Sequence, residues 1–80
     1  MTRSEIMEAC REIIYESVPE LEGRPLEEAT VINTDTGIDS MGFTLIICRI
    51  EAAFDIKIPD RRWRRLQTLG DVVTEIEKRI

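Results

Sequence analysis

The chain has 80 residues, a formal net charge of −5 and no histidine. A domain of this size buries only about 60% of its unfolded surface, which argues against an enclosed catalytic pocket and a free-standing enzyme. The negative charge argues against general binding to nucleic acid or anionic membranes. No apolar run approaches the ~20 residues of a membrane span, and residues 1–5 lack a signal-peptide core, so one cytoplasmic domain over residues 1–80 is expected.

The first predicted helix begins after Thr2 or Ser4, and Thr2 and Glu5 have the spacing of a capping box. Its apolar side chains recur at helical intervals until Pro19 stops the helix: Ile6, Cys10, Ile13, Ile14 and Val18. Residues 20–39 have no sustained period and contain several turn formers, which predicts a long loop. Four apolar side chains are expected to pin this loop to the core: Leu21, Leu26, Val31 and Ile32.

Three more helices follow the loop. The second is predicted from Ser40 to Phe54, a short third from Pro59 or Asp60 to Leu66, and the fourth from Gly70 to Arg79 with Thr68 as its cap. The expected fold is therefore an all-α four-helix bundle, with three main helices, a short third helix and a long first loop.

The second helix is apolar on two opposite faces. One face is the predicted core stripe and contains Phe43, Ile46, Ile47, Ile50, Ala53 and Phe54. The other contains Met41, Leu45, Cys48 and Ala52. Such a helix is either fully buried or presents its second face to a partner, and the small size of the domain favours the partner.

The string from Gly37 to Gly42 places the hydroxyl of Ser40 at an exposed helix N-terminus. Free N–H groups and the helix dipole favour an anionic phosphate there by ~0.3–1 kcal/mol. The chain has no histidine to activate the serine, and the nearest lysine, Lys57, lies beyond the far end of the helix. We therefore expect Ser40 to be modified rather than catalytic, although a serine in this position is also a common helix cap.

The triplet Asp39-Ser40-Met41 resembles the Asp-Ser-Leu hallmark of the acyl carrier protein family. The resemblance extends to Phe54-Asp55-Ile56, to Pro59 and to Thr68-Leu69-Gly70-Asp71, so that with the first helix it covers nearly the whole chain. The Ser40-Met41-Gly42 start and Trp63 are also weakly similar to D-alanyl carrier proteins of teichoic acid modification.

The resemblance implies that a separate transferase moves phosphopantetheine from coenzyme A onto Ser40. Acyl or aminoacyl groups would then be carried as thioesters in fatty-acid-like or specialised metabolite biosynthesis, including polyketide or nonribosomal peptide pathways. The implied partners are the phosphopantetheinyl transferase, an acyl- or aminoacyl-loading ligase and downstream synthase or transferase enzymes. A monomer that does not bind nucleic acid or membrane is expected.

The contact surface around Ser40 is expected to include Asp39, Met41, Leu45, Cys48 and Glu51. Asp39 either belongs to what the transferase recognises or only caps the helix. Many carriers of fatty acid synthesis have acidic residues on this helix, whereas this chain has Gly42, Leu45 and Ala52 there and keeps only Asp39 and Glu51.

A second departure from the family is a run of four arginines around Trp63: Arg61, Arg62, Arg64 and Arg65. Residues 1–60 hold five basic and thirteen acidic side chains, whereas residues 61–80 hold six basic and three acidic ones. Three interpretations of this run are open. The favoured one is a solvated face with Trp63 and Leu66 turned inward, and the second is a docking patch for an acidic partner or for coenzyme A phosphates. A nucleic-acid contact is the least favoured.

Cys10 and Cys48 lie far apart, without metal-type spacing or a histidine partner, so reduced thiols and no metal site are expected. The competing function is an unmodified small helical interaction module that binds a protein through Met41, Leu45 and the arginines.

Overall fold

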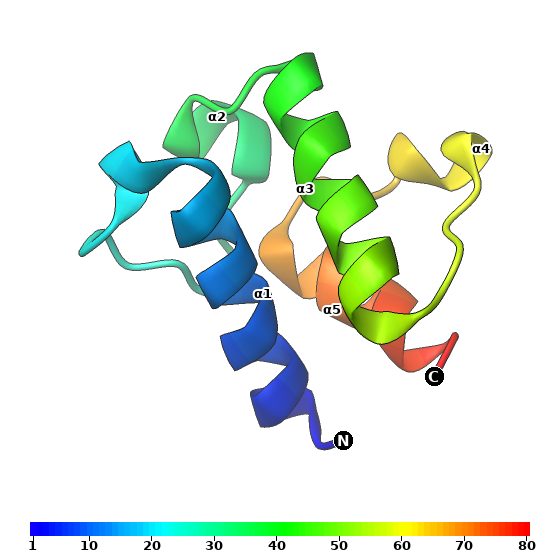
Figure 1. Ribbon diagram of the computed structural model, residues 1–80. Coiled ribbons are helices and arrows are strands. Elements are labelled where there is room, and N and C mark those ends of the chain that lie inside the picture. Colours follow the sequence, from blue (N-terminus) through cyan, green and yellow to red (C-terminus); the bar gives the residue numbers. More distant parts are fainter.

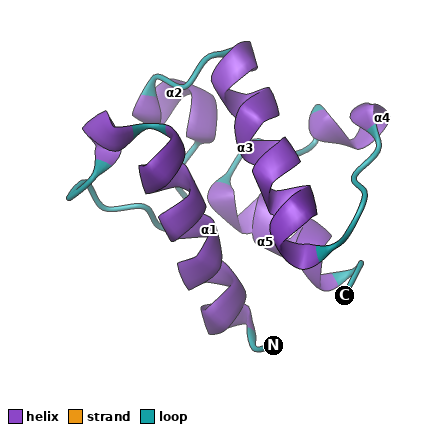
Figure 2. Cartoon of the chain, in the orientation of Figure 1, coloured by secondary structure: helices purple, strands orange, loops and turns teal.

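The computed structural model describes all 80 residues and contains helices, turns and loops, with no strand (Figure 2). The elements in chain order are α1 (Arg3–Ser17), the 3₁₀ turn η1 (Pro19–Leu21), α2 (Ile32–Thr36), α3 (Ser40–Phe54), α4 (Asp60–Trp63) and α5 (Leu69–Glu77). The predicted all-α fold, with three main helices, a short helix before the last one and a long first connection, is confirmed.

The helix starts follow the predicted capping chemistry. Thr2, rather than Ser4, caps α1, and it forms a reciprocal capping box with Glu5. Thr68 caps α5 in the same way with Asp71. Because each box satisfies N–H groups that a helix start leaves free, both helices begin at defined residues.

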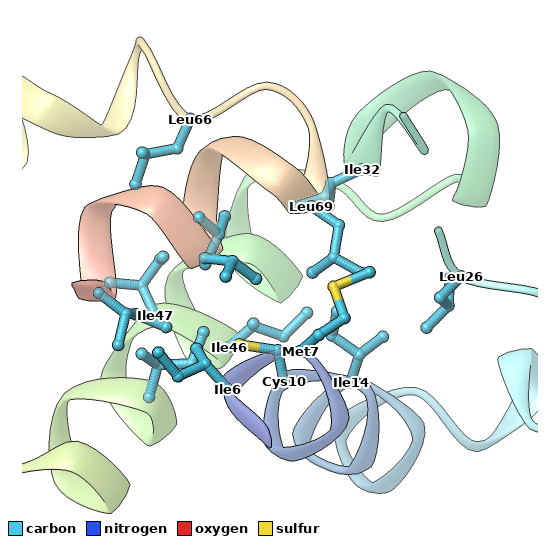
Figure 3. Close-up of a cluster of buried hydrophobic side chains, with 14 of the residues drawn as sticks. Ile6, Met7, Cys10, Ile14, Leu26, Ile32, Ile46, Ile47, Leu66 and Leu69 are labelled. Atoms are coloured by element: carbon cyan, nitrogen blue, oxygen red, sulfur yellow. The ribbon is translucent and has the colours of Figure 1, made fainter. Parts of the chain in front are cut away.

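The core lies where α1, α3 and α5 meet (Figure 3). The α3 side chains Ile46, Ile47 and Ile50 are almost completely buried there. Burying one such side chain stabilises the fold by roughly 1.5–3 kcal/mol, so these residues fix the orientation of α3. Helix α1 contributes the residues Ile6, Met7, Cys10 and Ile14, and the loop contributes Leu21 and Leu26.

Five details differ from the sequence-based expectation. Val31 is half-buried and lies outside the core cluster, and α5 spans Leu69–Glu77 in place of the predicted Gly70 to Arg79. The long connection is not irregular throughout, since it contains η1 and α2. The third helix ends at Trp63, and the chain reaches Leu66 through a turn. Ala53 is exposed rather than part of the core, because it borders a shallow hollow between the two chain ends and Phe54.

Backbone hydrogen bonds pin the long connection to the start of α5. The N–H of Ile32 donates to the carbonyl of Gln67, and the N–H of Leu69 donates to the carbonyl of Thr30, both at 2.9 Å. An isolated antiparallel bridge between Val31 and Thr68 lies between these bonds. These contacts hold the start of α2 against the segment that leads into α5.

Candidate functional site

The short connection between α2 and α3 ends at Asp39, which lies at the surface together with Ser40, the first residue of α3. Gly37 ends α2 with a φ of +78°, a left-handed conformation that costs other residues roughly 1–2 kcal/mol. The next side chain, Ile38, is buried in the core. The chain therefore turns outward directly after Ile38, and Asp39 and Ser40 are exposed.

Asp39 is the N-cap of α3. Its Oδ1 accepts a hydrogen bond of 2.8 Å from the N–H of Gly42. A Cβ atom at position 42 would lie 3.1 Å from Cγ2 of Ile38 and 3.4 Å from Oδ1 of Asp39. Gly42 thus leaves room for the capping contact of Asp39 and for the buried side chain of Ile38. This is a structural reason for a glycine at position 42, where many carriers of fatty acid synthesis have an acidic residue.

Ser40 is the first residue of α3, and its hydroxyl forms no hydrogen bond within the chain. Both chain termini lie at the bottom of Figure 1, whereas α3 begins at the top. The hydroxyl therefore stands free at the end of the molecule that lies away from the termini.

The outer face of α3 is apolar and open to solvent. Met41 is 83% exposed and Leu45 is 43% exposed, and Cys48 and Ala52 are exposed as well. The long connection does not cover this face, so full burial of the helix was the wrong alternative. Phe43 and Phe54, at the ends of the inner stripe, are half-buried.

Glu51 has a structural contact on the flank of α3. Its Oε2 accepts a hydrogen bond of 2.7 Å from the N–H of Ile58, in the segment that leads to α4. This carboxylate therefore holds the connection between α3 and α4, a role that the sequence did not indicate.

The arginine run is divided between two environments. Arg61, Arg64 and Arg65 are exposed and form no ion pair. Arg62 is half-buried and pairs with Glu75 of α5 at 3.0 Å, so it does not belong to a continuous basic surface. Trp63 is half-buried, its Nε1 donates to the carbonyl of Ile58, and Leu66 is buried, as predicted for the inward side.

Glu75 anchors α4 to α5 and was not anticipated. Its residue is only 3% exposed, and its carboxylate pairs with both Arg62 and Arg79. Burial alone would raise the pKa of Glu75, but hydrogen bonds and charge interactions with the two arginines outweigh burial and hold this pKa below its ordinary value. Arg79 also donates to the carbonyl of Lys57, which ties the end of the chain to the connection before α4.

A surface groove of about 480 Å³ lies beside Ser40. Helix α2, the first turns of α3 and the segment from Trp63 to Gln67 form its walls. Phe43 and Trp63 meet in this groove edge to face, with their ring centroids 6.4 Å apart. Periodicity within one helix cannot reveal such a groove, since its walls come from segments far apart in the sequence.

The structure contains no group of three or more acidic or cysteine side chains that could hold a metal ion. No helix combines the length and the apolar character needed to cross a membrane.

Comparison with known proteins gives a consistent family. Residues 6–76 match the family model described as "Phosphopantetheine attachment site". The chain is 33% identical over 79 residues to an acyl carrier protein of Thermotoga maritima, covering 99% of this chain and 96% of the relative. It is 34% identical over 77 residues to one of Phenylobacterium zucineum, covering 96% of each chain, and 34% identical over 76 residues to one of Caulobacter vibrioides, covering 95% and 96%.

The family model spans most of the chain, and these relatives match it almost from end to end. Members of this family are carriers that depend on phosphopantetheine and not enzymes, and their biosynthetic partners perform the chemistry. The chain belongs to the acyl carrier protein family.

Proposed function

We propose that Ser40 is the residue to which phosphopantetheine is attached. The observation that carries this proposal is the position of its hydroxyl, which is exposed, without a hydrogen-bond partner and at the first residue of α3. The positive end of the helix dipole favours the phosphate that would be linked there.

In the attachment step, Oγ of Ser40 forms a bond to phosphorus while the bond to the 3′,5′-bisphosphate of adenosine breaks. The hydroxyl proton passes to a base of the transferase. Once attached, the group supplies a thiol that forms a thioester with the cargo.

The experiment is the intact mass of the protein after incubation with coenzyme A, magnesium and a broad-specificity phosphopantetheinyl transferase. Wild type should gain the mass of one phosphopantetheine. Ser40→Ala should gain none, and Ser4→Ala, which removes an exposed serine elsewhere, should behave as wild type. If wild type gained no mass with several transferases, the unmodified interaction module would become the better account.

The cargo is proposed to be an acyl or aminoacyl group, in fatty-acid-like or specialised metabolite biosynthesis. A cytoplasmic site of action follows from this proposal, because the transferase and the loading enzymes use coenzyme A or activated acids. Loading ligases and downstream synthases or transferases are the proposed partners of the loaded protein.

We propose further that these partners dock on the outer face of α3, with Met41, Leu45 and Cys48 at the centre of the contact. Exposed Arg49 lies on the same helix, and exposed Arg61 and Arg65 lie on the neighbouring segment around α4. Asp39 lies next to the attachment point. Glu51 is assigned to the edge of the docking surface, because its carboxylate already accepts a hydrogen bond from the N–H of Ile58. A partner surface that is complementary to this face has an apolar depression surrounded by acidic side chains.

A further inference from the structure

The groove beside Ser40 combines an apolar floor with a polar rim. Phe43, Trp63 and Leu66 contribute apolar surface, and Val31 and Ile32 extend it towards α2. The rim carries the side chains of Asn33, Thr34 and Gln67, which form no hydrogen bond within the chain. All three side chains are exposed and therefore available to form hydrogen bonds with a ligand that has polar groups.

Only two charged side chains line the groove, Asp39 and Arg64. The carboxylate of Asp39 already accepts the N–H of Gly42. Arg64 forms neither an ion pair nor a hydrogen bond, in contrast to Arg62 one residue before Trp63, which is paired with Glu75. The lining thus includes one arginine whose exposed side chain has no partner, and the planar fork of a guanidinium suits a carboxylate or a phosphate.

We propose that Arg64 pairs with an anionic oxygen of the group attached to Ser40 when that group lies in this groove. The inference depends on the attachment at Ser40 proposed above. Two anions have the required chemistry: the phosphodiester that joins the arm to Oγ, and the free carboxylate of a dicarboxylic acyl cargo.

The surroundings explain why a counter-ion is needed. A phosphodiester on Ser40 would stand next to the carboxylate of Asp39, and like charges in one groove repel each other. Arg64 lines the same groove and offsets that repulsion. The aromatic pair of Phe43 and Trp63 then provides a surface for the uncharged part of the arm or cargo.

The test compares four forms of the protein: unmodified, and loaded by the transferase from coenzyme A, acetyl-coenzyme A or succinyl-coenzyme A. Trp63 is the only tryptophan and lines the groove, so its fluorescence and indole N–H resonance report occupancy. The phosphorus resonance reports the phosphodiester. Each form is prepared as wild type, as Arg64→Gln, and as the controls Arg61→Gln and Arg65→Gln, which remove exposed arginines that do not line the groove.

If the phosphodiester is the anion, the arm alone should change the Trp63 and phosphorus signals. If the cargo carboxylate is the anion, the Trp63 change should appear with succinyl and not with acetyl. In either case Arg64→Gln should lower the ratio of occupied to empty groove about twofold to fivefold, the range that an exposed ion pair supports, and the two controls should retain the wild-type ratio.

Two results would contradict the pairing by Arg64 and still be consistent with attachment at Ser40. One is fully loaded protein whose signals are the same in wild type and Arg64→Gln for every cargo. The other is an equal loss in the two control variants, which would indicate general charge rather than a pair. Protein that gains no mass refutes the attachment at Ser40, and this inference with it, so the two failures are distinguished by mass.

Discussion

The two cysteines differ in their surroundings. Cys10 is completely buried in α1, and burial raises the pKa of its thiol to about 12. Cys48 is exposed on the outer face of α3. Because the thiolate is the reactive form, iodoacetamide at neutral pH should modify Cys48 and leave Cys10 intact.

Intact mass after labelling measures this difference. Wild type should take up one label, Cys48→Ser none, and the unfolded protein two. Rapid labelling of folded Cys48→Ser would show that the core around Cys10 opens more easily than its burial indicates.

Glu75 is the only buried charged residue of the fold. Glu75→Gln keeps the shape but removes the charge that Arg62 and Arg79 share, which should cost roughly 1–3 kcal/mol of the free energy of unfolding. Because its pKa in the folded state lies below the unfolded value of about 4.3, the carboxylate stabilises the fold above that value. This contribution is lost as the pH falls through the lower, folded pKa.

Urea unfolding at a series of pH values tests both statements. Between pH 5 and pH 3, wild type should lose more stability than Glu75→Gln, so that the difference between them narrows at low pH. A constant difference across this range would mean that the amide substitution acts through packing and not through charge.

Single residues were predictable where the helical period alone decides their environment. Ser40, Met41 and Leu45 are exposed as expected because their places follow from the start and phase of one helix. The partners of Arg62 were not predictable, since its contact with Glu75 depends on how α4 packs on α5. Arg62 and Arg64 look alike in the sequence, and only the fold distinguishes the paired from the unpaired side chain.

Helix α3 has a buried face and an exposed apolar face, and the proposed docking on the exposed face gives a prediction for this helix. Leu45→Glu should weaken the binding of a partner enzyme by roughly 1–3 kcal/mol, which is the contribution of burying a leucine side chain. An acidic partner surface would also repel the new negative charge. The melting temperature should change little, since Leu45 is 43% exposed.

Ile47→Ala is the matched control on the inner face of the same helix. Ile47 is completely buried, so its truncation should cost roughly 2–5 kcal/mol of stability. Circular dichroism during heating and the KM of the transferase for the carrier measure the two effects. Unfolding of Leu45→Glu, or undiminished binding by it, would contradict the division of the helix into two faces.

Short elements were the part of the fold that the sequence could not predict. Helix α2 has five residues, too few for an apolar period, and no side chain caps its start. Its stability comes from outside: the buried side chain of Ile32, the hydrogen bond from the N–H of Val31 to Asp35, and the backbone bond to Gln67. The groove beside Ser40 was missed for the same reason, because α2 forms one of its walls.

Charge is distributed unevenly over the whole molecule. Residues 1–39, which contain α1 and the long connection, carry three basic and ten acidic side chains. Residues 40–66, which contain α3 and α4, carry six basic and three acidic ones. The proposed docking face thus belongs to the positive part of an otherwise negative protein, which favours one orientation when an acidic partner approaches.

This asymmetry predicts salt-dependent association with partner enzymes. The rate at which wild type associates with the transferase that modifies it should fall as ionic strength rises, because the screening length is only about 10 Å at 0.1 M salt. In the variant Arg61→Gln/Arg65→Gln the association rate should depend less steeply on salt, and most of the change in binding should lie in this rate. The melting temperature should change little, since both side chains are exposed and unpaired.

Glu12→Gln/Glu16→Gln is the control, because it changes two exposed charges on α1, outside the positive segment. This variant has less negative charge but an unchanged docking face. Its association rate should therefore depend on salt as steeply as that of wild type. Stopped-flow association over a series of salt concentrations decides between the two descriptions of the arginines. Equal slopes for wild type and the arginine variant would assign Arg61 and Arg65 to a solvated face, and the apolar centre of α3 would then have to account for partner binding alone.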